Sequence, residues 1–73
     1  MKYNAIKIDF YEDFDGFMSY LSTEEFSGTK TQIRQQVRTY SKDLRKKHPR
    51  CRIIRSCDHR DFQDFAPQLR FMV

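Results

Sequence analysis

Residues 30–47 constrain the fold more than any other part of this chain. Their apolar residues recur at spacings of four, three and four, which forms one stripe along an α-helix. They are Ile33, Val37, Tyr40 and Leu44. The preceding Thr29-Lys30-Thr31-Gln32 has the form of a capping box, and His48-Pro49 ends the helix because a residue before proline disfavours helical angles. We therefore expect an amphipathic α-helix over residues 30–47.

Three other segments have the period of two that is typical of strands. Residues 2–10 place Ile6, Ile8 and Phe10 on one face and charged side chains on the other. Residues 51–57 (CRIIRSC) alternate in the same way, with Cys51, Ile53, Arg55 and Cys57 on one face. Residues 68–73 (QLRFMV) predict a last strand.

Residues 13–22 admit two structures. Asp13 resembles a helix N-cap, and the apolar residues that follow have helical spacing. They are Phe14, Phe17, Met18 and Leu21. Asp15-Gly16 is instead a favoured pair for a two-residue hairpin turn. We expect a short helix, because these four residues fit the helical template better than alternation does.

Two connecting segments complete the chain. Residues 22–29 are expected to form a connector in which Gly28 can adopt a positive φ. Residues 58–67 are expected to form a loop or a turn of helix whose Phe62 and Phe65 pack onto the core.

The expected order is therefore strand, helix, helix, strand, strand (β-α-α-β-β). This predicts a single α+β domain over residues 1–73, in which a small three-stranded, mainly antiparallel sheet packs on one long amphipathic helix. A chain of 73 residues has a small core, and its seven Phe and four Tyr can close that core with few residues. Not all of these aromatic side chains can be buried. We therefore expect some of them to lie at an interface with a protein or nucleic acid, or between the two copies of a homodimer.

Positive charge is concentrated in one block of the chain. Residues 29–60 carry eleven Lys and Arg against two Asp, a net charge of +9. Residues 1–28 carry two Lys against six Asp and Glu, a net charge of −4. Such a concentration attracts phosphates or an acidic protein surface, which the overall +4 spread evenly would not do.

A second stripe follows the predicted helix about 100° around from the apolar one and consists of Arg34, Arg38, Ser41 and Arg45, with Thr31 and Lys42 beside it. Arginine matches phosphate geometry bidentately, and hydroxyl groups add short contacts, so this stripe is suited to lie along phosphates. An ordinary solvated helix face is the alternative, but Asp43 is the only acidic residue in 30–47, so no Glu–Lys pairs decorate the helix. The candidate binding residues are Arg34, Arg38, Arg45, Lys42, Thr31, Ser41, Lys46 and Lys47.

Four residues belong to the types that bind zinc: His48, Cys51, Cys57 and His59. Their spacing matches none of the usual zinc sites, and Cys51 and Cys57 would lie roughly 20 Å apart along a strand. We expect the two cysteines to act as small buried apolar residues, and we expect neither a metal nor another cofactor.

The sequence holds no recognisable acid–base pair, activated nucleophile or phosphate-binding glycine loop. The favoured hypothesis is a small non-enzymatic nucleic-acid-binding protein with a regulatory or accessory role. The alternative is a protein-interaction module or inhibitor of phage or plasmid accessory type, which would bind an acidic surface of a host or defence nucleic-acid machine. A cytoplasmic protein is expected, because the sequence shows neither a signal peptide nor the ~20 apolar residues of a membrane helix.

Overall fold

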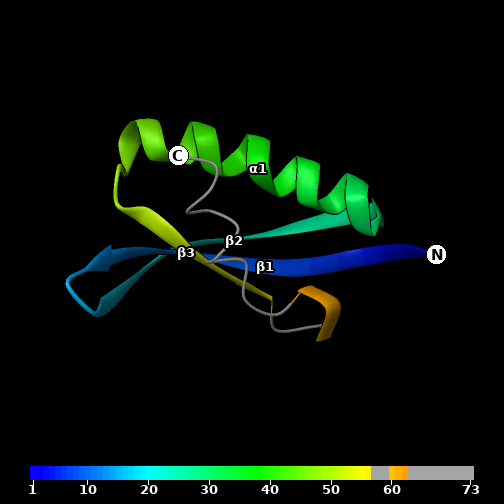
Figure 1. Cartoon of the computed structure of the whole chain (residues 1–73), viewed down its shortest axis with the longest axis horizontal. Coiled ribbons are helices and arrows are strands. Elements are labelled where there is room, and N and C mark those ends of the chain that lie inside the picture. Colours follow the sequence, from blue (N-terminus) through cyan, green and yellow to red (C-terminus); the bar gives the residue numbers. More distant parts are fainter. Residues whose placement is uncertain (57–59, 63–73) are drawn as a thin grey trace.

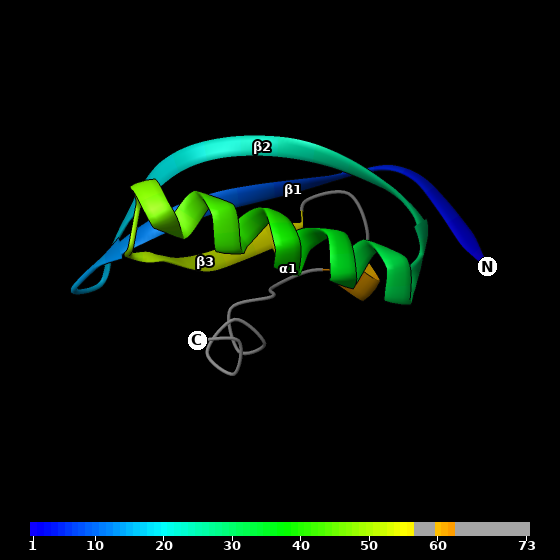
Figure 2. The same cartoon turned by 90° about the horizontal axis from the view of Figure 1, so that it is seen from above.

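The computed structural model describes residues 1–56 and 60–62. The elements are β1 (Lys2–Phe14), β2 (Phe17–Thr29), α1 (Lys30–Lys47), β3 (Cys51–Ser56) and the short 3₁₀ helix η1 (Arg60–Phe62). The three strands form one antiparallel sheet in the order β2-β1-β3, and α1 covers one face of it (Figure 1). Viewed from above, α1 runs along the sheet (Figure 2).

The predicted class is confirmed: a three-stranded antiparallel sheet packs on one long helix. The predicted order β-α-α-β-β is wrong, because the chain runs β-β-α-β and residues 13–22 form no helix. Asp15 and Gly16 have φ values of 50° and 97°, the two positive values of a type I′ turn. The Asp13 carboxylate accepts a hydrogen bond from the Gly16 N–H at 3.2 Å, so it closes the hairpin turn instead of capping a helix.

Residues 22–29 belong to β2 and are not a connector. β2 pairs with β1 from the Phe14–Phe17 pair at the turn to the Lys2–Thr29 pair at the far end. This pairing satisfies the backbone polar groups of β2 that face β1, along the whole length of the hairpin. β2 therefore supplies a strand of the sheet that the sequence pattern did not predict, while the predicted strand 68–73 lies outside the described residues.

The core lies between α1 and the sheet. Ile6, Ile8 and Phe10 of β1 are buried on the face beneath α1, as their alternation predicted. Ile33 and Val37 meet them from the helix, and the Phe10 ring centre lies 4.8 Å from that of Tyr40. Aromatic and branched side chains thus close a small core with few residues.

The predicted packing of Phe62 onto the core is also confirmed. Phe62 is only 1% exposed, and its ring lies edge-on to Tyr3 with centroids 5.0 Å apart. Phe65, which was expected beside it, lies outside the described residues.

An extra residue in β3 changes which side chains share a face. Ile53 pairs with Tyr11 and Cys51 pairs with Glu12, so Arg52 is left over between them as a bulge. Cys51 and Ile54 are consequently both buried. The predicted strict alternation, which placed them on opposite faces, is therefore wrong.

α1 begins and ends where the sequence predicted. The Thr29 hydroxyl accepts from the Gln32 N–H at 3.2 Å, and the Thr29 N–H donates to the Gln32 side-chain oxygen at 2.9 Å. These two bonds complete the capping box. At the other end, the His48 N–H donates to the Leu44 carbonyl at 2.8 Å before the chain turns at Pro49.

Gly28 supports the capping box by leaving space for it. A Cβ at Gly28 would lie 2.6 Å from the Gln32 side-chain oxygen, whereas a Cβ at Gly16 would meet nothing within 4 Å. Both glycines have positive φ, so alanine is strained at either position. We expect Gly28→Ala to lower the free energy of unfolding by about 1 kcal/mol more than Gly16→Ala, because only Gly28→Ala displaces the cap. Urea unfolding of both variants measures the difference, and equal losses would contradict a supporting role for Gly28.

Candidate nucleic-acid interface

The two flanks of α1 lie in different surroundings. Gln36 donates from its side chain to the Ser27 carbonyl at 3.0 Å, and the Tyr40 hydroxyl donates to the Glu24 carboxylate at 2.9 Å. Both partners belong to β2, so this flank of the helix faces β2. Because β1 lies between β2 and β3, the opposite flank faces the β3 side of the sheet.

The opposite flank carries most of the predicted binding residues. Thr31, Arg34, Arg38 and Lys42 fall within about 80° of one another around the helix, and all four are exposed. We refer to these four residues as the basic flank. Among the described residues, none of the three cations of the basic flank is paired with a carboxylate.

Ser41 does not share this exposed surface. Its side chain is fully buried, and its hydroxyl donates to the Arg38 carbonyl at 3.0 Å. It lies four residues after the buried Val37, at the border of the apolar stripe, where a small side chain fits against the sheet. The prediction that Ser41 lies on the exposed stripe is therefore wrong.

Arg45 is only partly exposed. One of its guanidinium nitrogens is buried and has no hydrogen-bond partner among the described residues. Its positive charge lies close enough to act on the Cys51 thiol, but burial outweighs that charge and raises the pKa of Cys51 to about 11. Arg45 thus lies between the basic flank and the start of β3, and it offers less surface to a partner than Arg34 or Arg38.

The last turn of α1 adds two further cations. Lys46 and Lys47 are exposed, and the Lys46 ammonium lies 3.6 Å from the Asp43 carboxylate. Such an exposed pair contributes little to stability. Lys47 has no ion pair among the described residues, so it adds to the positive field at this end of the helix.

The residues considered for zinc divide between described and undescribed parts of the chain. His48 lies 3.5 Å from the Glu12 carboxylate, and Cys51 is buried beneath α1. Cys57 and His59 lie outside the described residues. Within residues 1–56 and 60–62, no three His, Cys, Asp or Glu side chains come together as metal ligands would.

The hairpin turn exposes apolar side chains that were predicted to lie on a helix. Phe14 is 41% exposed and Phe17 is 77% exposed. The Arg50 guanidinium lies over the Phe14 ring, 5.2 Å from its centre. The Asp15-Gly16 pair was the sequence signal for this turn, but the helical spacing of the neighbouring apolar residues outweighed it.

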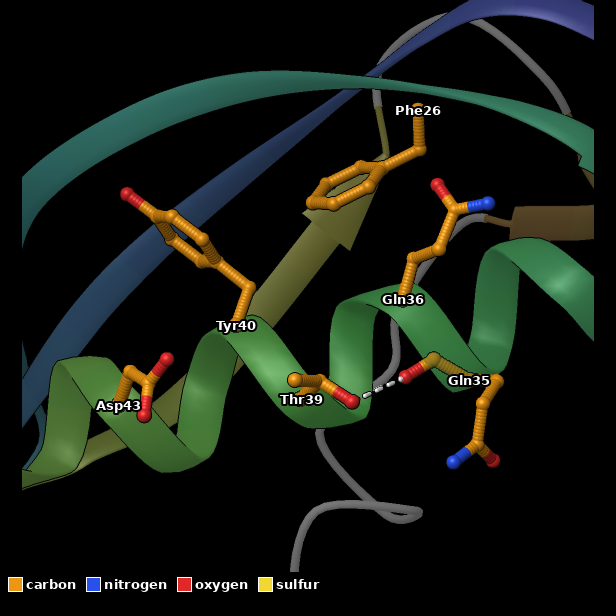
Figure 3. Close-up of a pocket in the computed structure, with 6 residues that line it drawn as sticks. All are labelled: Phe26, Gln35, Gln36, Thr39, Tyr40 and Asp43. Carbon is orange, nitrogen blue, oxygen red and sulfur yellow. Dashed lines mark hydrogen bonds between the residues drawn. The ribbon is translucent and has the colours of Figure 1, made fainter.

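A groove of about 430 Å³ lies on the other side of α1 (Figure 3). Phe26 and Tyr40 form its apolar part, and Asp43 lies at one end. The Thr39 hydroxyl donates to the Gln35 carbonyl at 3.1 Å (Figure 3), so that hydroxyl is already bonded within the helix. The groove presents a carboxylate and no unpaired cation, so it does not suit a phosphate.

Tyr40 stands at the edge of this groove with a shifted pKa. Its hydrogen bond with Ser22 lowers the pKa of the phenol, but burial and the Glu24 carboxylate together raise it by more. The phenol therefore stays protonated and keeps its hydrogen bond to Glu24.

Comparison of the chain with known protein families, with curated proteins and with solved structures found no match. Among the described residues, α1 is too polar to cross a membrane, and no other helix is long enough to do so. Function is therefore inferred from the arrangement of the residues themselves.

Proposed function

We propose that this protein is a non-enzymatic nucleic-acid-binding protein with a regulatory or accessory role, and that the basic flank contacts the phosphate backbone. The observation that carries this proposal is the row Arg34, Arg38 and Lys42, three exposed cations without carboxylate partners among the described residues. Arginine binds phosphate bidentately, and the nearby Thr31 hydroxyl can add a hydrogen bond.

The spacing of these cations supports a functional use. Residues four apart on a helix are neighbours, about 6 Å apart along its axis, and like charges at that spacing destabilise the helix. A solvated helix face would normally alternate the sign of its charges. A row of cations that repel one another is stabilised when an anionic partner neutralises them.

The charge distribution over the sheet supports the same reading. Two acidic side chains of the hairpin, Asp9 and Glu25, point to the face that α1 does not cover, where Glu25 is opposite Lys7 and Asp9 is opposite Thr23. Glu24 lies on the other face and bonds to Tyr40 of α1. The Asp9 carboxylate accepts the Thr23 hydroxyl at 2.5 Å. The net charge of −4 over residues 1–28 lies on the hairpin, whereas the cations of the basic flank lie on α1, so the charge differs between these elements and orients the molecule toward a polyanion with the basic flank leading.

Binding to a fluorescent random-sequence duplex tests this proposal. With three phosphate contacts, the affinity is expected to fall roughly 40-fold between about 50 and about 200 mM salt, because each contact releases condensed counterions. Fluorescence anisotropy measures the affinity, and size-exclusion chromatography with light scattering gives the mass of the complex. A lack of binding at low salt, or an affinity insensitive to salt, would contradict the proposal and favour a protein partner.

A further inference from the structure

The hairpin turn places two aromatic rings side by side at one end of the molecule. Phe14 and Phe17 are directly opposite each other in the β1–β2 pairing, so their side chains lie on the same face of the hairpin. Met18 pairs with Asp13, one position along, and its side chain therefore lies on the other face. Exposed apolar groups gathered at one place mark a contact site more often than scattered ones do.

The structure holds this turn beside the basic end of α1. The Asp13 N–H donates to the Arg50 carbonyl at 2.9 Å, and His48 lies beside Glu12. The hairpin turn and the C-terminal end of α1 consequently lie at the same end of the molecule (Figure 2). The Arg50 guanidinium covers the Phe14 ring, while Phe17 remains largely open.

Two cations lie at the same end of the molecule as the exposed rings, and one of them, Arg50, contacts Phe14. Arg50 and Lys47 are both exposed at this end and have no ion pair among the described residues. The two acidic residues next to Phe14 are Asp13, whose carboxylate accepts the Gly16 N–H, and Asp15, which lies on the loop outside the Phe14–Phe17 pair. An apolar pocket of a protein would accept the rings but would gain nothing from the cations at this end.

We propose that this end of the molecule binds unpaired nucleotides, with a base stacked on Phe17 and the adjacent phosphates near Arg50 and Lys47. Aromatic rings and cations together are the usual means of binding single-stranded nucleic acid, because every base has a face on which a ring can stack. Paired bases in a duplex are already stacked and offer no such face. The inference rests on the proposed function and narrows its substrate to nucleic acid that has an unpaired segment.

A pair of tryptophan variants reports stacking directly, because the chain contains no tryptophan. Phe17→Trp places an indole on the basic side of the hairpin, and Met18→Trp places one on the opposite side. On titration with an oligothymidylate, Phe17→Trp fluorescence is expected to be quenched and Met18→Trp fluorescence to change little. Equal quenching of the two would overturn the proposal.

Alanine variants measure the contribution to affinity. Phe17→Ala is expected to weaken oligothymidylate binding at least about five-fold, since one base–aromatic stack contributes ~1–3 kcal/mol. The affinity of Phe17→Ala for a fully paired duplex is expected to change less than about two-fold. Met18→Ala is expected to change the affinity for either ligand by less than about two-fold. Both side chains are exposed, so the variants should fold, which circular dichroism verifies.

The outcomes separate this inference from the proposed function. If Phe17→Ala binds the single strand as tightly as the unaltered protein does, and substitution of Arg34 and Arg38 weakens binding, the inference fails and the proposed function stands. If substitution of Arg34 and Arg38 has no effect on either ligand, the proposed function fails. If Phe17→Ala abolishes capture of a purified protein partner and leaves oligothymidylate binding unchanged, the turn is a protein contact and the inference is wrong.

Discussion

Reversal of charge at Arg34 and Arg38 is expected to reduce the affinity for a random-sequence duplex roughly 100-fold. Each arginine lost from a phosphate removes a charged hydrogen bond worth ~1.5 kcal/mol or more, and the introduced glutamates add repulsion. Both side chains are exposed and make no ion pair among the described residues, so Arg34→Glu with Arg38→Glu should leave the fold intact. Fluorescence anisotropy at low salt measures the loss, and urea unfolding verifies the fold.

A charge-matched pair of variants distinguishes a specific contact from the general field of the protein. Arg34→Gln with Arg38→Gln removes two positive charges from the basic flank. Asn4→Asp with Ser19→Asp adds two negative charges at exposed positions of β1 and β2, off the helix. Both double variants lower the net charge from +4 to +2. A larger loss of affinity in the first variant assigns the phosphate contact to the basic flank. Equal losses would show that affinity depends only on the net charge of the protein, acting at long range.

The second large effect is expected in the core. Phe10 is fully buried, and its ring packs against those of Phe26 and Tyr40 with centroids 6.4 and 4.8 Å apart. Phe10→Ala is expected to lower the free energy of unfolding by ~3–5 kcal/mol, because it removes transfer energy and leaves a cavity. A domain of this length has a total free energy of unfolding of roughly 4–11 kcal/mol. Phe10→Ala should therefore be largely unfolded or only marginally stable.

Phe17→Ala provides the control for Phe10→Ala, since the same atoms are removed from a side chain that is 77% exposed. Urea unfolding of Phe17→Ala is expected to differ from that of the unaltered protein by less than about 0.5 kcal/mol. Similar losses of unfolding free energy in the two variants would contradict the assignment of Phe10 to the core and of Phe17 to an exposed turn.

The features that the sequence predicted correctly are those determined by nearby residues. The capping box of Thr29 and Gln32 and the stop before Pro49 involve residues within one turn of helix, so local chemistry determined both ends of α1. The burial of Ile8 and Phe10 followed from strict alternation on one strand. Each signal is complete within its own segment.

The hairpin was missed because its evidence is spread along the chain. Phe14, Phe17, Met18 and Leu21 have helical spacing, and the Asp15-Gly16 turn was weighed only against that local pattern. What decides between the two structures is the pairing of β1 with β2, which joins residues as far apart as Lys2 and Thr29. Pairing over that separation has no local signature in a single sequence.

The candidate site was predictable in part for a similar reason. Helical period alone placed Arg34, Arg38 and Lys42 on one exposed flank, although their contact with a partner remains a prediction. The period could not show that Ser41 is buried, because a small hydroxyl at the border of an apolar stripe can bond to its own helix. It also could not show Arg50 over Phe14, since that contact depends on the missed hairpin.

The salt dependence of binding tests the central claim most directly. The slope of log affinity against log salt concentration counts the phosphates that the protein neutralises, at about 0.9 per contact on duplex DNA. For the charge-matched variants, Arg34→Gln with Arg38→Gln should reduce the magnitude of that slope by about 1.8, and Asn4→Asp with Ser19→Asp should leave it unchanged. A slope that is the same in both variants and in the unaltered protein would show that the basic flank of α1 does not contact phosphate.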